Sequence, residues 1–158
     1  MPALDMASGG DEPDLAPFRL NRLMAAWNAR LEVRLAAQGA SFAQWRVVMV
    51  AARAQRPLTI VELAALTLVP HSTLSRQLAG MAAEGLLLRT RHAADGRAVS
   101  VQLTPQGRAR YRKWLPIALA EAEAGLAVLS ATERTTLLHL IGLLEHAVMP
   151  DQVSANIA

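Results

Sequence analysis

The feature that most constrains the fold is residues 59–103, where two short helical patterns are followed by a strand pattern that reverses once. Thr59 and Glu62 have the three-residue spacing of a capping box, in which each side chain hydrogen-bonds the other residue's backbone N–H, so a helix is predicted to begin there. A second helix is predicted from about Pro70, because proline is tolerated in a first turn. Two helices joined by so few residues indicate a helix-turn-helix unit.

The second helix separates an apolar stripe from a polar face. At about 100° per residue, Leu74, Leu78 and Met81 share one side. The candidate DNA-binding positions on the polar side and in the opening turn are His71, Ser72, Thr73, Ser75 and Arg76. Arginine reads guanine with two hydrogen bonds, and hydroxyls bind phosphates or bases, so this face suits the major groove. For this helix alone, a plain solvated face remains the alternative.

A hairpin pattern follows the second helix. Gly85 ends the helix, and strands are predicted over residues 86–91 and 98–103 around Asp95-Gly96, a pair that favours a tight reversal. The candidate DNA-binding residues of this hairpin are Arg89, Arg91, Asp95 and Arg97. An arginine at the tip is suited to the minor groove, with Asp95 holding Arg97 in position. The hairpin completes a winged helix-turn-helix, and we predict a mainly α fold with a small β-wing.

Charge is unevenly distributed, although the formal net charge is only +3. Residues 41–114 hold eleven basic and three acidic side chains, whereas residues 1–15 hold four acidic ones and no basic one, and residues 115–158 five acidic and one basic. Basic charge therefore concentrates where double-stranded DNA is expected to bind, with affinity that depends on salt. The same balance argues against a protein-interaction module whose winged helix has lost DNA affinity.

Further helical patterns lie on both sides of this unit. Leucines recur at helical spacing over residues 15–37, a long helix is predicted after Thr104, and Ser130 and Glu133 form another capping box. The last helix is apolar nearly all round, so it must be buried on more than one side. In so small a chain, a second copy is the simplest cover, and we predict a homodimer.

The predicted organisation is one compact domain. We expect dimerisation helices at 14–40 and 105–148 around a DNA-binding lobe at 41–104, with an acidic disordered tail at 1–13 and a C-terminal tail at 149–158. In such a dimer, two recognition helices address half-sites about 34 Å apart on the DNA, so the operator should be roughly palindromic.

These segments resemble the MarR (multiple antibiotic resistance regulator) family of winged-helix transcription factors over nearly the whole chain. The resemblance is carried by Glu62-Leu63-Ala64, Ser72-Thr73-Leu74-Ser75-Arg76, Glu84-Gly85-Leu86-Leu87, Asp95-Gly96-Arg97 and Val101-Gln102-Leu103-Thr104-Pro105-Gln106-Gly107. It implies that the helix from about Pro70 is the recognition helix and that Asp95 and Arg97 contact the DNA backbone or the minor groove. The chain departs from the family at Leu68, where glycine is common, and at Pro70, where a capping serine is common.

The resemblance also implies a small, often phenolic or carboxylated effector that binds between the dimerisation helices and the winged lobe and releases the DNA. The candidate ligand-binding residues are Trp27, Arg30, Trp45, Arg46, Tyr111 and Trp114. An aromatic floor beside a guanidinium suits an aromatic anion. The alternative remains open that these tryptophans are ordinary core residues and the arginines are solvated. Repression is the expected sign of regulation, because a ligand-releasable dimer most simply blocks a promoter.

Other functions receive less support from the sequence. The chain has no cysteine, which excludes a disulfide framework and thiolate catalysis. The second interpretation is a metal-responsive or a ligand-independent DNA-binding regulator. The candidate metal ligands are His71, His92, His139 and His146, but their spacing matches no metal motif. No nucleophile elbow or phosphate-binding glycine loop is visible, so neither an enzyme nor a cofactor is expected. Without a targeting segment or a long apolar run, we expect a cytoplasmic location and no membrane partner.

Overall fold

The computed structural model describes residues 15–91 and 99–149, so both predicted tails, apart from Met149, and the tip of the wing lie outside the described residues. The elements in chain order are α1 (Ala16–Ala36), α2 (Phe42–Arg53), β1 (Leu58–Thr59), α3 (Ile60–Thr67), α4 (His71–Ala83), β2 (Leu87–Arg91), β3 (Val99–Leu103), α5 (Pro105–Leu126) and α6 (Ala131–Val148). The predicted mainly α fold with a small β-wing is confirmed.

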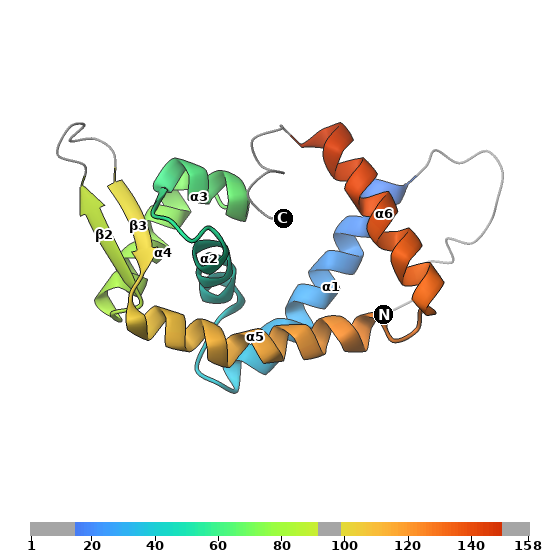
Figure 1. Ribbon diagram of the computed structural model, residues 1–158, viewed down its shortest axis with the longest axis horizontal. Coiled ribbons are helices and arrows are strands. Elements are labelled where there is room, and N and C mark those ends of the chain that lie inside the picture. The colour runs from blue at the N-terminus through green and yellow to red at the C-terminus, as the bar shows by residue number, and fades with distance from the viewer. Residues whose placement is uncertain (1–14, 92–98, 150–158) are drawn as a thin grey trace.

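A winged lobe lies at one end of α5 and consists of α2, α3, α4 and the small sheet (Figure 1). Its core is closed within the single chain, since apolar side chains of every helix in the lobe are buried together. The core residues with no exposed surface are Val47, Val48, Leu63, Leu74 and Leu78. The predicted apolar stripe of the second helix is confirmed, because Leu74, Leu78 and Met81 are all buried.

The sheet has three antiparallel strands in the order β1-β3-β2. The sequence predicted β2 and β3 but not β1, a two-residue strand in which Leu58 pairs with Val101. Leu87 lies opposite Leu103 at the base of the hairpin, and both are buried, whereas the next residue, Leu88, is 54% exposed. In the middle of the hairpin, Ser100 and Val101 of β3 remain buried, whereas β2 is exposed from Leu88 to Thr90.

The predicted helix starts are confirmed. Reciprocal capping boxes are present at Ser130 and Glu133 and at Thr59 and Glu62, and the hydroxyl of Thr104 accepts a hydrogen bond from the N–H of Gly107 at the start of α5. A Cβ atom at Gly107 would lie 2.1 Å from the carbonyl oxygen of Leu86. Glycine there lets α5 approach the winged lobe closely.

The other end of α5 belongs to what we call the arm, residues 16–30 and 118–149 (Figure 1). In α1, Leu31 and Leu35 are buried against the winged lobe, but Leu23 and Met24 are about half exposed. Helix α6 has no buried residue at all. The apolar surface of the arm thus lacks a cover among the described residues.

Candidate nucleic-acid interface

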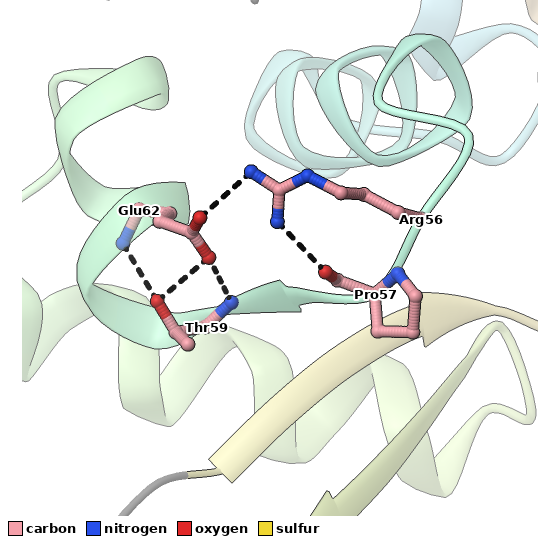
Figure 2. Close-up of polar contacts among 4 residues, drawn as sticks. All are labelled: Arg56, Pro57, Thr59 and Glu62. Atoms are coloured by element: carbon pink, nitrogen blue, oxygen red, sulfur yellow. Dashed lines mark hydrogen bonds and ion pairs between the residues drawn. The ribbon is translucent and has the colours of Figure 1, made fainter. Parts of the chain in front are cut away.

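Helix α3 begins at a polar cluster that ties it to the preceding loop (Figure 2). The carboxylate of Glu62 accepts hydrogen bonds from the backbone N–H of Thr59 at 2.7 Å and from its hydroxyl at 2.9 Å. Arg56 donates to the same carboxylate at 2.7 Å and to the carbonyl of Pro57 at 3.1 Å. The hydrogen bond from Arg56, aided by those from Thr59, lowers the pKa of Glu62 from 4.5 to about 2, against the opposing effect of partial burial.

The turn between α3 and α4 is tight and strained. Leu68 ends α3 in the left-handed region, with φ 53° and ψ 32°. A residue with a Cβ atom pays about 1 kcal/mol or more for this conformation. Val69 is buried and Pro70 precedes the first helical residue of α4 without a side-chain cap. The glycine that the MarR resemblance leads one to expect at Leu68 is thus replaced at a position where its freedom is needed.

Helix α4 presents the predicted polar face to solvent. His71, Ser72, Thr73 and Arg76 are exposed, whereas Ser75 is half-buried. The opposite side holds the buried stripe, so α4 cannot rotate about its axis without exposing leucines to water. The face is therefore fixed, polar and free of bulky apolar side chains.

Two glutamines that sequence reasoning missed hold α4 in place. Gln77 of α4 donates to the carbonyl of Ala43 in α2, and Gln44 of α2 donates to the carboxylate of Glu84 at 2.9 Å. Both contacts span more than thirty positions in the chain, and exposed glutamines carry no sequence signal for such pairing. They join the first turn of α2 to the middle and the C-terminal end of α4, outside the core.

The wing strands place basic residues next to this face only in part. Arg89 lies opposite Val101 in the β2–β3 ladder and is exposed, and Arg91 lies opposite Val99. The predicted contact residues Asp95 and Arg97 lie outside the described residues. Of the predicted wing contacts, the structure therefore positions the side chain of Arg89 and the backbone of Arg91.

Arg76 and Arg89 differ from the arginines that are held in ion pairs. Arg30, Arg34, Arg56 and Arg134 each lie 2.6–2.7 Å from a carboxylate. Within residues 15–91 and 99–149, neither Arg76 nor Arg89 has such a partner. Unpaired, exposed cations bind phosphate or guanine without first breaking an ion pair. The polar face of α4 and the wing thus form a surface with DNA-binding chemistry.

The six candidate ligand residues are distributed over separate contacts and cavities of the described residues. Trp45 and Tyr111 stack on each other, with ring centroids 6.0 Å apart and planes inclined by 8°. The guanidinium of Arg46 lies 5.5 Å from the ring centroid of Phe42. Trp45 thus packs on Tyr111 of α5, whereas the buried Nε of Arg46 has no hydrogen-bond partner among the described residues. The sequence could not show which faces of α2 and α5 would meet.

The remaining three candidates line two separate cavities. Trp27 and Arg30 line a cavity of about 180 Å³ between α1 and α5, together with Leu23, Ala26, Glu121 and Gly125. Trp114 lines a more polar cavity of about 240 Å³ on the winged lobe, together with Gly39, Gln44, Glu84, Leu86, Gln106 and Arg110. Only the first cavity combines an aromatic ring and a guanidinium from the predicted set.

The described part of the chain holds no group of three or more histidine or acidic side chains placed to bind a metal ion. His71 lies in α4, His139 and His146 lie in α6, and His92 falls outside the described residues. No single helix of the described ranges is long and apolar enough to cross a membrane. Helices α5 and α6 together have the length and composition of a span, but the chain bends by 109° at the break between them.

Comparisons with known proteins agree with this arrangement. A family model described as MarR family matches residues 38–98. A MarR-family transcriptional regulator from Silicibacter pomeroyi, solved by crystallography, is 32% identical, with a TM-score of 0.74 over 86% of this chain and 92% of that one.

Two further relatives extend the comparison. The HTH-type transcriptional repressor YetL of Bacillus subtilis (strain 168) is 28% identical over 136 residues, which are 85% of this chain and 80% of that protein. BpsR of Bordetella bronchiseptica, whose DNA binding is regulated by 6-hydroxynicotinic acid, is 24% identical, with a TM-score of 0.67 over 80% of this chain and 98% of that one. The second likeness shows a shared fold.

Proposed function

Because the chain belongs to the MarR family of transcriptional regulators, we propose that it is a homodimeric repressor that binds double-stranded DNA at a pseudo-palindromic operator. Helix α4 enters the major groove, and the wing contacts the backbone or the adjacent minor groove. Arg76 reads base edges with Ser72 and Thr73 beside it, and Arg89 contributes charge from the wing. Arg91, Asp95, Arg97, His71 and Ser75 complete the proposed contact set.

One observation carries this proposal: the exposed side of α4 is polar and includes Arg76 without a carboxylate partner among the described residues, while its other side is locked into the core. A bidentate contact with a base depends on a helix of fixed orientation and on an unpaired, exposed guanidinium. The buried stripe of α4 supplies the first, and Arg76 supplies the second. A merely solubilising face has no such need for the two glutamine anchors of α4.

The proposed dimer forms through the arm. Exposed apolar side chains recur along both of its terminal helices, and burying them removes apolar surface from water. A two-fold axis through such an interface repeats α4 on the same side of the dimer, which suits two half-sites about one DNA turn apart.

The effector is proposed to bind the cavity between α1 and α5, because Trp27 and Arg30 line it together. A small aromatic acid offers a ring for Trp27 and a carboxylate for the terminal nitrogens of Arg30, whose Nε is paired with Glu121. Fluorescence anisotropy of a preformed complex with 6-hydroxynicotinic acid and benzoate as probes tests this step. If either probe releases the DNA and Arg30→Ala weakens that release, the site is supported. If Arg30→Ala leaves the release unchanged, the site is contradicted.

DNA binding is tested with the full chain and a duplex that it selects from a random-sequence library. The affinity for that duplex and for a scrambled one is measured across a salt series, for the wild type and for Arg76→Ala. We expect Arg76→Ala to lower discrimination between the two duplexes about tenfold or more, because a good bidentate base contact is worth about 1–3 kcal/mol.

The matched control is Arg112→Ala, which removes an exposed arginine from α5. It should lower the affinity for both duplexes equally, as the loss of a phosphate contact does, or leave both affinities unchanged. Equal weakening of both duplexes by Arg76→Ala contradicts a base-reading role. A wild-type chain without sequence preference contradicts the proposed function and favours a nonspecific or protein-interaction role.

A further inference from the structure

The contact between α1 and α5 contains a buried acidic side chain that the sequence did not single out. Glu121 of α5 is 1% exposed, and its two carboxylate oxygens lie 2.6 Å from the Nε atoms of Arg30 and Arg34. These contacts are ion pairs by distance without regular hydrogen-bond geometry. A buried carboxylate is costly unless it is paired, so this residue holds two arginines that are one helical turn apart on α1.

A steric contact lies one turn further along the same face of α5. A Cβ atom at Gly125 would lie 2.6 Å from the ring of Trp27, so α1 and α5 approach closely only because this position is glycine. Trp27 precedes Arg30 by three residues and Gly125 follows Glu121 by four, so the two contacts are successive along the crossing of the helices. Charge and shape therefore fix the same crossing.

This crossing joins the two parts of the molecule. Beyond it, α1 buries Leu31 and Leu35 in the winged lobe, and before it α1 carries the exposed residues Leu23 and Met24 of the arm. Glu121 lies 16 residues from Pro105, the end of α5 at the winged lobe, which is about 24 Å along the helix. A change of about 10° at the crossing moves that end of α5 by about 4 Å, which is about one base pair of DNA.

We propose that Glu121, paired with Arg30 and Arg34, is a positioning residue that sets the separation of the two recognition helices, and hence the half-site spacing that the dimer prefers. The inference rests on the proposed dimeric, DNA-binding function. Glu121 touches no DNA in this account: it acts through the angle at which α1 leaves the winged lobe.

The test uses full-length wild type, Glu121→Gln and Gly125→Ala, with a set of duplexes in which the two selected half-sites are moved apart or together by one and two base pairs. Glu121→Gln keeps the shape of the side chain and removes its charge. We expect its preference for the wild-type spacing to fall at least fivefold, while its affinity for scrambled DNA changes less than twofold. Gly125→Ala should shift the optimum spacing, because Trp27 must move.

The matched control is Glu123→Gln, two residues away, which neutralises an exposed carboxylate paired with Arg134 across the corner between α5 and α6. It should retain the wild-type spacing profile. A merely structural role for Glu121 predicts weaker binding at all spacings, not a changed profile. If Glu121→Gln does not fold, Arg30→Ala, which leaves Arg34 in place, should reduce the spacing preference by a smaller factor.

The outcomes separate this inference from the function on which it rests. A wild type that is monomeric, or indifferent to DNA sequence, overturns the proposed function and the inference together. A wild type that prefers one spacing, with folded dimeric Glu121→Gln or Arg30→Ala showing the same profile, overturns the inference alone.

Discussion

The winged lobe and the arm are built from similar local signals, yet among the described residues only the lobe covers its own apolar core. Thr59 with Glu62 and Ser130 with Glu133 form the same reciprocal capping box, and both start regular helices. Helix α3 then buries Ile60, Leu63 and Thr67, whereas α6 buries nothing. Local sequence thus decides that a helix forms, while the partner available to its apolar face decides what that helix does.

The largest expected effect concerns the arm. Leu140→Lys with Leu143→Lys places two charges on α6, where the wild-type side chains are 50% and 55% exposed in the single chain. If a second copy buries them, each substitution makes the free energy of dimerisation about 2 kcal/mol less favourable. The dissociation constant of the dimer should then rise about a thousandfold. Light scattering over a concentration series measures this change.

The control for that variant is Glu145→Lys, which adds the same total charge on the opposite side of α6. It should affect the dimer much less. Far-ultraviolet circular dichroism should show the helices of the winged lobe unchanged in the double variant. A double variant as dimeric as the wild type contradicts the difference drawn between the arm and the lobe, because the arm would then be stable without this cover.

Core substitutions sharpen the same contrast. Leu78→Ala empties a fully buried site in α4 and should lower the free energy of unfolding by about 3 kcal/mol at every protein concentration. Leu140→Ala should lower it by an amount that grows with protein concentration, because its contacts lie in a partner. Urea unfolding at two concentrations separates the two cases, and a concentration-independent effect of Leu140→Ala contradicts the account.

The two capping boxes differ in their electrostatics, which gives a smaller effect. Arg56 holds the pKa of Glu62 at about 2, below its ordinary 4.5. A lowered folded-state pKa adds stability above the unfolded value and loses it as pH falls through the folded one. Glu62→Gln should therefore cost about 1 kcal/mol at neutral pH, allowing for solvent screening, and the cost should fade between about pH 4.5 and 2.

Glu133→Gln is the matched control in the arm. The hydrogen bonds from Ser130 lower the pKa of Glu133, but no arginine adds to them. Its loss should therefore show a weaker dependence on pH than the loss of Glu62. Denaturant unfolding between pH 7 and pH 3 measures both variants, and equal pH dependence argues against the role given to Arg56.

The smallest effect concerns strain in the winged lobe. Leu68→Gly should raise the free energy of unfolding by about 0.5–1 kcal/mol, because Leu68 is 77% exposed and left-handed, so little burial is lost. Leu68→Ala keeps the Cβ atom and should give no gain. Thermal unfolding of the two variants compares them, and a gain from alanine equal to that from glycine contradicts the strain.

The sequence predicted the features that depend on neighbours along the chain. Capping chemistry predicted the helix starts at Thr59, Thr104 and Ser130, and periodicity predicted which side of α4 faces the core. Both predictions are confirmed. Strand β1 was missed, since two residues that also begin a helix show no alternation.

Contacts between distant segments were beyond such reasoning. The pairing of Glu121 with Arg30 joins positions about ninety residues apart, and each side chain alone is typical of a solvated helix face. The six candidate ligand residues lie in separate contacts and cavities of the described residues for the same reason: periodicity gives the face of a helix, not the element that the face meets. Their role in ligand binding stays a prediction. The proposed DNA contacts at Asp95 and Arg97 stay predictions.

The native mass of the full chain at micromolar concentration tests whether a second copy covers the arm. Light scattering should give twice the chain mass of 17.0 kDa, because the arm is proposed to be covered by a second copy. A mass of 17.0 kDa would contradict the account, since α6 would then keep its apolar surface in water and two recognition helices could not be held on one operator.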